Sequence, residues 1–148
     1  MLPAPFSYDR PLLAEQYCDA LQGAGLIDVR SGLFLAAPRR TGKSTFLRTD
    51  LLPAFAKRGW TSVYVDLWTD KAADPGKVIA AAIKRVLAQH AGAIAKLAKN
   101  SGLEKVNLFG ALSLNVNALE LPENVTLADA LEALHIAAKT AVAIVIDE

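Results

Sequence analysis

Short apolar segments alternate along the chain with longer segments whose apolar residues recur at helical spacing. The continuous apolar run at residues 33–37 predicts a strand buried on both faces. Residues 60–68 are β-branched and aromatic with an alternating pattern, which predicts a second strand. The run "AVAIVI" at residues 141–146 predicts a third buried strand.

Amphipathic helices are predicted between these strands, over residues 11–24, 42–57 and 76–99 and again from Thr126. Strands that alternate with helices indicate a mostly parallel sheet covered by helices on both faces. We therefore expect a three-layer α/β/α fold. Residues 1–30 form a helical lead-in, and residues 31–148 form the core.

Three local features refine this prediction. Pro53 lies inside the second helix, so that helix must kink there or restart with Asp50 as its cap. Thr126 and Asp129 have the spacing of a capping box, which marks the start of the last helix. The alternating pattern near residues 105–121 predicts a small β-hairpin inserted into the core.

Composition and charge exclude several classes of protein. The chain has 148 residues and a net charge of +1, so a global basic field does not support binding to nucleic acid, although a local basic patch remains open. Its single cysteine, Cys18, forms no internal disulfide and fits a reducing compartment. The N-terminus lacks the pattern of a signal peptide and no membrane span is predicted, so a cytoplasmic location is expected.

The predicted strand at residues 33–37 leads directly into the sequence "APRRTGKST" at residues 37–45. This sequence has the phosphate-loop pattern, except that Ala37 replaces the usual first glycine. Gly42 allows the backbone to approach a phosphate, and Lys43 supplies a cation for the β- and γ-phosphates. The alternative is an ordinary basic loop. The predicted nucleotide-binding residues are Ala37, Pro38, Arg39, Arg40, Thr41, Gly42, Lys43, Ser44 and Thr45.

Two carboxylates, Asp147 and Glu148, follow the third predicted strand. An acid at the end of a buried strand can help to hold Mg²⁺ beside a phosphate loop. We expect Ser44 and Asp147 to hold Mg²⁺, and Glu148 to orient the water that attacks the γ-phosphate. By itself this signal is weak, because acids commonly follow apolar strands.

Together "FLAAPRRTGKSTFLR" and "VAIVIDE" resemble the Walker A and Walker B motifs of P-loop NTPases of the additional-strand, catalytic-glutamate division. The "PRRTGKS" loop is similar to that of prokaryotic AAA-like ATP-binding proteins. The resemblance implies binding of ATP·Mg²⁺ and hydrolysis, with Lys43 and Glu148 as catalytic residues. It also implies that hydrolysis drives a conformational change in another domain or a partner protein.

The resemblance further implies two strands after the acids, one of which lies between the strand at residues 33–37 and the strand at residues 142–146. We therefore expect the 148 residues to be an N-terminal fragment of a longer protein. Without the intervening strand, self-association through the open sheet edge is also possible.

Other functions stay open at this point. The first alternative is a nucleotide-dependent switch or interaction module with little hydrolysis. A GTPase or a small-molecule P-loop kinase would use the same lysine and a carboxylate. The chain shows no guanine-reading Asn-Lys-x-Asp segment, and the Asp-Glu pair favours water as the acceptor.

Overall fold

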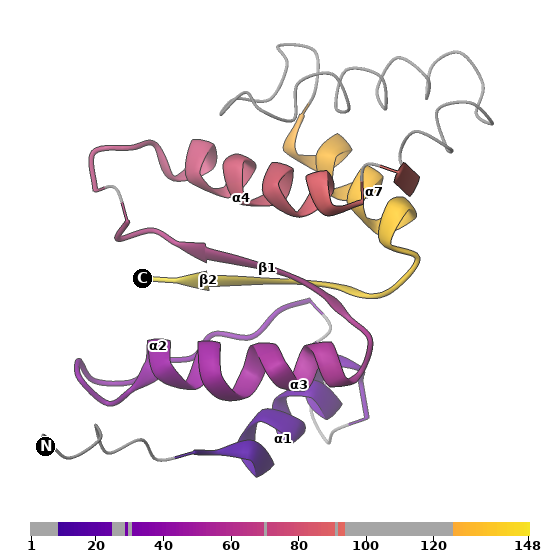
Figure 1. Ribbon diagram of the computed structural model, residues 1–148. Helices are drawn as coiled ribbons and strands as arrows, with labels where there is room; N and C mark the ends of the chain where they lie inside the picture. Colours follow the sequence, from indigo (N-terminus) through magenta and orange to yellow (C-terminus); the bar gives the residue numbers. More distant parts are fainter. Residues whose placement is uncertain (1–8, 25–28, 30, 70, 91, 94–125) are drawn as a thin grey trace, which may run out of the picture. The chain divides into compact units, whose positions relative to one another are not determined.

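The computed structural model describes residues 9–24, 29, 31–69, 71–90, 92–93 and 126–148 (Figure 1). By contact, the chain divides into two compact units, Met1–Gly59 and Trp60–Glu148, which we call the loop unit and the sheet unit. The loop unit contains α1 (Pro11–Leu21), α2 (Lys43–Phe46), η1 (Leu47–Leu51) and α3 (Leu52–Lys57). The sheet unit contains β1 (Thr61–Asp66), α4 (Pro75–Gln89), α7 (Leu127–Ala138) and β2 (Val142–Asp147). The mixed α/β class is confirmed.

In the loop unit, α1 packs against η1 and α3. Helix α1 begins at Pro11 as predicted, because proline suits the first turn of a helix. Ala14 and Cys18 are fully buried on its inner face. The Tyr17 ring lies 5.7 Å from the Phe46 ring, centroid to centroid. Burial raises the pKa of the Cys18 thiol, so this cysteine acts as a small apolar core residue.

The helix predicted over residues 42–57 forms as the continuous series α2, η1 and α3. Its middle part, η1, is a π-helix that ends just before Pro53. The ring of a proline clashes with the i−4 carbonyl of a regular α-helix, and the wider turn is how this helix accommodates it. Asp50 does not cap a restarted helix, so that alternative was wrong. Its carboxylate accepts a hydrogen bond from the Arg10 backbone N–H instead.

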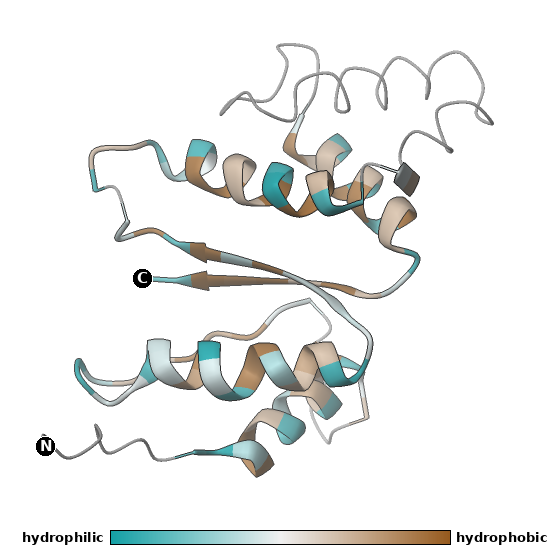
Figure 2. Ribbon diagram, viewed as in Figure 1, coloured by the Kyte–Doolittle hydropathy of each residue, from teal (hydrophilic) through white to brown (hydrophobic). Residues whose placement is uncertain are grey.

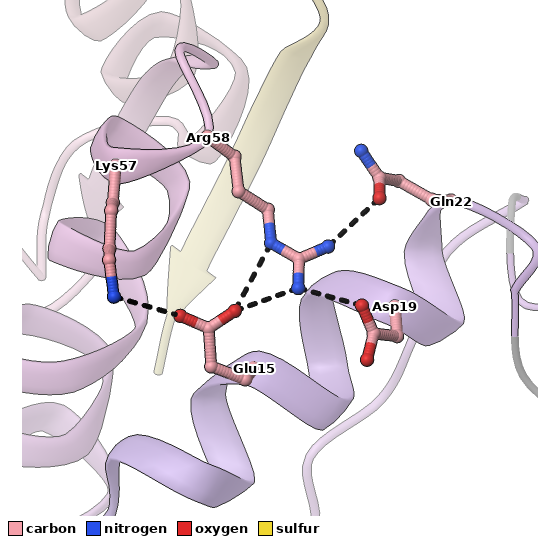
Figure 3. A network of polar contacts seen from close by, with 5 residues as sticks. All are labelled: Glu15, Asp19, Gln22, Lys57 and Arg58. Carbon is pink, nitrogen blue, oxygen red and sulfur yellow. Dashed lines mark hydrogen bonds and ion pairs between the residues drawn. The ribbon is translucent and has the colours of Figure 1, made fainter.

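A polar network joins α1 to the turn that follows α3 (Figure 3). The Arg58 guanidinium donates at 2.7 Å to both Glu15 and Asp19, and at 2.8 Å to Gln22. The hydrogen bonds that Arg58 donates to Glu15 and Asp19 raise its pKa above its ordinary range. Lys57 adds a longer ion pair with Glu15, at 3.9 Å. By donating hydrogen bonds to three residues, Arg58 therefore holds α1 against the end of α3.

The prediction of a buried strand at residues 33–37 was wrong. The structure assigns no strand to residues 32–38, and Phe34 is fully exposed. Leu33 is 42% exposed. A strand requires a hydrogen-bonded neighbour, and within the described residues the only sheet pairs β1 with β2. The apolar sequence alone predicts a strand at residues 33–37, but it does not show whether a neighbouring strand is present to form hydrogen bonds with it.

The sheet unit confirms the two other predicted strands. Strands β1 and β2 pair in parallel, with Val63 opposite Ile144 and Asp66 opposite Asp147. The carboxyl ends of parallel strands lie at the same edge of a sheet. Asp66 and Asp147, the last residues of β1 and β2, are therefore neighbours at that edge. Helices α4 and α7 cover one face of this pair (Figure 1).

The core of the sheet unit lies between this face and the two helices (Figure 2). Helix α4 packs on β1 and α7 packs on β2, and the two helices contact each other. Ile83 and Leu134 are fully buried, as is Val63 on the strand. The cluster consists of Val63, Val65, Ala82, Ile83, Leu87, Ala130, Ala133, Leu134 and Ala137. Small alanines allow close approach of the helices, as the alanine-rich sequence suggests.

Helix α4 accounts for most of the helix predicted over residues 76–99. Its last residue is Gln89, and the His90 N–H closes the helix by bonding the Leu87 carbonyl at 2.9 Å. Residues 92–93 are again helical, and the rest of the predicted span, residues 94–99, lies outside the described residues. The predicted hairpin near residues 105–121 lies outside the described residues. Within the described residues, no helix has the length and apolar character needed to cross a membrane.

The capping box at the start of α7 is confirmed. The Asp129 carboxylate accepts from the Thr126 hydroxyl at 2.6 Å and from the Thr126 backbone N–H at 2.8 Å. The Thr126 hydroxyl accepts from the Asp129 N–H at 3.2 Å. The bond from the Thr126 hydroxyl is the main cause that lowers the pKa of Asp129 below its ordinary value, and the bond from the Thr126 backbone N–H lowers it further.

We expect Asp129→Asn to lower the melting temperature at neutral pH. A depressed carboxyl pKa stabilises the fold above the unfolded value of about 3.9, and this stabilisation is lost as the pH falls through the folded pKa. The difference between wild type and variant should therefore shrink in acid. Thermal unfolding followed by circular dichroism from neutral to acidic pH measures it. A difference that stays constant across this range contradicts the assignment.

Candidate functional site

We call residues 37–45 the 37–45 loop. They follow residues 32–36, which form no strand, and include the first residues of α2. Arg40 and Gly42 have left-handed backbones, with φ of 63° and 81°. The Thr41 hydroxyl donates to the Pro38 carbonyl at 2.8 Å across the turn. Gly42 suits its position because residues with a Cβ rarely adopt that φ. The result is a compact turn whose shape depends on Gly42.

Helix α2 begins directly after this turn. Its first hydrogen bond runs from the Phe46 N–H to the Gly42 carbonyl, at 2.8 Å. The N–H groups of Lys43, Ser44 and Thr45 precede that bond and have no i−4 carbonyl within the helix. Such amides suit an anion, and the helical series that they begin continues to Lys57.

Three cations border the turn. Lys43 is half-buried at the helix start, whereas Arg39 and Arg40 are exposed. No hydrogen bond or ion pair joins any of these three side chains to another residue in the part of the chain that the structure describes. Among the described residues, therefore, no carboxylate neutralises the Lys43 ammonium. This arrangement suits the binding of a phosphate.

The predicted acids lie at the end of β2, in the sheet unit. Asp147 is only 6% exposed, and its Oδ2 accepts a hydrogen bond from the Tyr64 hydroxyl at 2.7 Å. Glu148 follows the strand and is exposed. The Tyr64 bond fixes the orientation of the Asp147 carboxylate, while Glu148 is accessible to solvent.

Sequence reasoning did not find Tyr64. A usable signal was present, because Tyr64 alternates with Val63 and Val65 and so faces the other side of the sheet. Once the register is known, Tyr64 lies opposite Val145 and diagonal to Asp147 on that side.

Sequence reasoning also missed Arg10, which contacts the loop. Its Nη2 donates to the Thr41 carbonyl at 3.2 Å, and its backbone N–H donates to Asp50 at 3.1 Å. No local pattern predicts this contact, because Arg10 and Thr41 are 31 residues apart.

The predicted site residues therefore fall into two groups. Residues 37–45 belong to the loop unit, and Asp147 and Glu148 belong to the sheet unit. Magnesium coordination by Ser44 and Asp147 stays a prediction. Among the described residues, no three His, Cys, Asp or Glu side chains gather as a metal site. One serine, one aspartate and nucleotide oxygens would form a different kind of site.

The chain was compared with known proteins in three ways. It matches no protein-family profile, no curated protein and no solved structure. The function of this chain is therefore inferred from its motifs and from the geometry of their residues.

Proposed function

We propose that this chain is a P-loop ATPase of the AAA-like type, which binds ATP·Mg²⁺ through the 37–45 loop and hydrolyses it. The observation that carries the proposal is the form of the loop. Two left-handed residues and the bond between Thr41 and Pro38 shape the turn, and a helix begins at Lys43. A phosphate loop needs a glycine for close backbone approach and a helix that begins at the lysine, and Gly42 and Lys43 fit these two needs.

The residues of the loop fit a triphosphate. Lys43 would pair with the β- and γ-phosphates, because no described carboxylate competes for its ammonium. The backbone N–H groups of Lys43 and Ser44 would bind phosphate oxygens. Thr45 follows and would approach the α-phosphate. Arg39 and Arg40 add positive charge at the exposed side of the loop.

The acids of the sheet unit would supply the remaining chemistry. Ser44 and Asp147 offer the hard oxygen ligands that Mg²⁺ prefers, and bound Mg²⁺ would neutralise charge on the phosphates. The Tyr64 hydroxyl holds Asp147 in one orientation. Glu148, which is exposed, would orient the attacking water.

A nucleotide-binding module with little turnover is the second candidate. The observation that favours it is the division of the site residues between two compact units. Binding requires the loop of the first unit, whereas hydrolysis also requires Asp147 and Glu148 of the second. The segment that precedes the loop is also exposed and outside any strand.

Nucleotide competition tests the proposal. A fluorescent ATP analogue bound to the chain should be displaced by ATP in the presence of Mg²⁺, at a lower concentration than by GTP. Phosphate release should follow with water as the only acceptor. Displacement without phosphate release supports the second candidate. Tighter binding of GTP would indicate a GTPase, and absence of binding by any nucleotide contradicts both candidates.

A further inference from the structure

Arg10 joins the N-terminus of α1 to the 37–45 loop and to η1. Its guanidinium Nη2 donates to the Thr41 carbonyl at 3.2 Å. Its backbone N–H donates to the Asp50 carboxylate at 3.1 Å. The guanidinium also lies beside Gly42, since a Cβ built on this glycine would be 4.0 Å from Nη2. One residue thus contacts both the 37–45 loop and η1.

The position of Arg10 is fixed by its place at the start of α1 and by its backbone bond to Asp50. Arg10 is the N-cap residue of α1, where backbone N–H groups lack helical partners and the helix dipole is positive. The Asp50 carboxylate lies at that end and satisfies one of these groups. The Asp50 bond therefore fixes the end of α1 from which Arg10 reaches the loop.

The contact with the Thr41 carbonyl restricts the orientation of the peptide group that joins Thr41 to Gly42. A peptide unit is planar and trans, so the Thr41 carbonyl and the Gly42 N–H point in opposite directions. A donor that holds the carbonyl therefore fixes the direction of the Gly42 N–H. Such a contact restricts Gly42 in particular, because glycine adopts a wider range of backbone conformations than any other residue.

From this geometry we infer that Arg10 is a positioning residue for phosphate binding, which holds the Thr41–Gly42 peptide so that the Gly42 N–H faces the bound phosphates. This inference rests on the proposed function, because it assigns a role within the same nucleotide site. It adds a residue from outside the motif. Arg10 acts through the Thr41 carbonyl and contacts no phosphate itself.

The test compares variants of the full chain by titration with a fluorescent ATP analogue in the presence of Mg²⁺. Arg10→Ala should weaken binding about tenfold, a loss that matches one hydrogen bond from a charged donor. Arg10→Lys retains the charge and one donor, so it should recover part of this loss. The Gly42 amide resonance of nucleotide-free protein should move in Arg10→Ala, as expected of a reoriented peptide.

Arg58→Ala is the matched control, because it removes an arginine that holds α1 without contacting the loop. It should lower the melting temperature and leave nucleotide affinity within about twofold, well below the effect of one lost charged hydrogen bond. Equal losses of affinity in Arg10→Ala and Arg58→Ala would overturn the inference, since general loosening of α1 would then explain both. Normal affinity in Arg10→Ala, with weakened binding in Lys43→Ala, overturns the inference alone. Absence of binding by wild type overturns the proposed function and the inference with it.

Discussion

Replacing Lys43 with alanine is expected to weaken binding of ATP·Mg²⁺ by about 10- to 150-fold. The Lys43 ammonium is half-buried at the start of α2 and engages no described carboxylate. In the proposed site it pairs with the β- and γ-phosphates. A hydrogen bond to a charged group contributes about 1.5–3 kcal/mol, which corresponds to this range of affinity. Titration with a fluorescent ATP analogue measures the change.

Lys57→Ala is the matched control for this experiment. Lys57 lies in the same unit, and its side chain is 80% exposed and makes a long ion pair with Glu15. The substitution removes the same charge, so a general electrostatic effect would weaken binding in both variants. We expect the affinity of Lys57→Ala to equal that of wild type. If Lys43→Ala also binds like wild type, the 37–45 loop is an ordinary basic loop.

The second large effect is expected from Glu148→Gln, which should reduce ATP hydrolysis by about 10²- to 10⁴-fold. Glu148 is exposed at the end of β2, next to the oriented Asp147. Glutamine keeps the shape of the side chain but removes the carboxylate that would orient and polarise water. Nucleotide affinity should change little, because this group acts on water rather than on phosphate. Parallel measurements of phosphate release and nucleotide affinity separate the two effects.

Glu132→Gln provides a control for the loss of one negative charge. Glu132 is exposed on α7 and lies outside the proposed site. Its hydrolysis rate should match that of wild type. An unchanged rate in Glu148→Gln would remove Glu148 from the mechanism. If wild type binds ATP but releases no phosphate, the chain is a binding module.

Local signals allowed much of the fold to be predicted from the sequence. Pro11 marked the start of α1, and Thr126 with Asp129 marked the start of α7. The alternating pattern before Asp66 predicted β1, and the apolar run before Asp147 predicted β2. These elements depend on capping groups and side-chain periodicity, which are both written within a few residues.

Features that depend on distant partners were not predicted. The run at residues 33–37 has the composition of a buried strand, yet only a neighbouring strand could make it one. The π-helix before Pro53 is one of several ways to accommodate a proline, and the sequence does not select among them.

The candidate site divides in the same way. The local sequence predicted that a helix begins near Gly42, and α2 begins at Lys43, whereas the left-handed backbones of Arg40 and Gly42 were not predicted. The contacts of Tyr64 with Asp147 and of Arg10 with Thr41 join residues 83 and 31 positions apart. Such contacts depend on strand register and helix packing, which no local pattern encodes.

The most direct test of the account is a titration of the ¹⁵N-labelled full chain with ATP·Mg²⁺, followed through its backbone amide resonances. If the 37–45 loop binds the triphosphate, the resonances of Gly42, Lys43, Ser44 and Thr45 will shift together and saturate with one dissociation constant. In Lys43→Ala the same shifts will require a much higher nucleotide concentration. Amides of the loop that stay in place while ATP is in excess, or saturable shifts confined to other residues, would contradict the account.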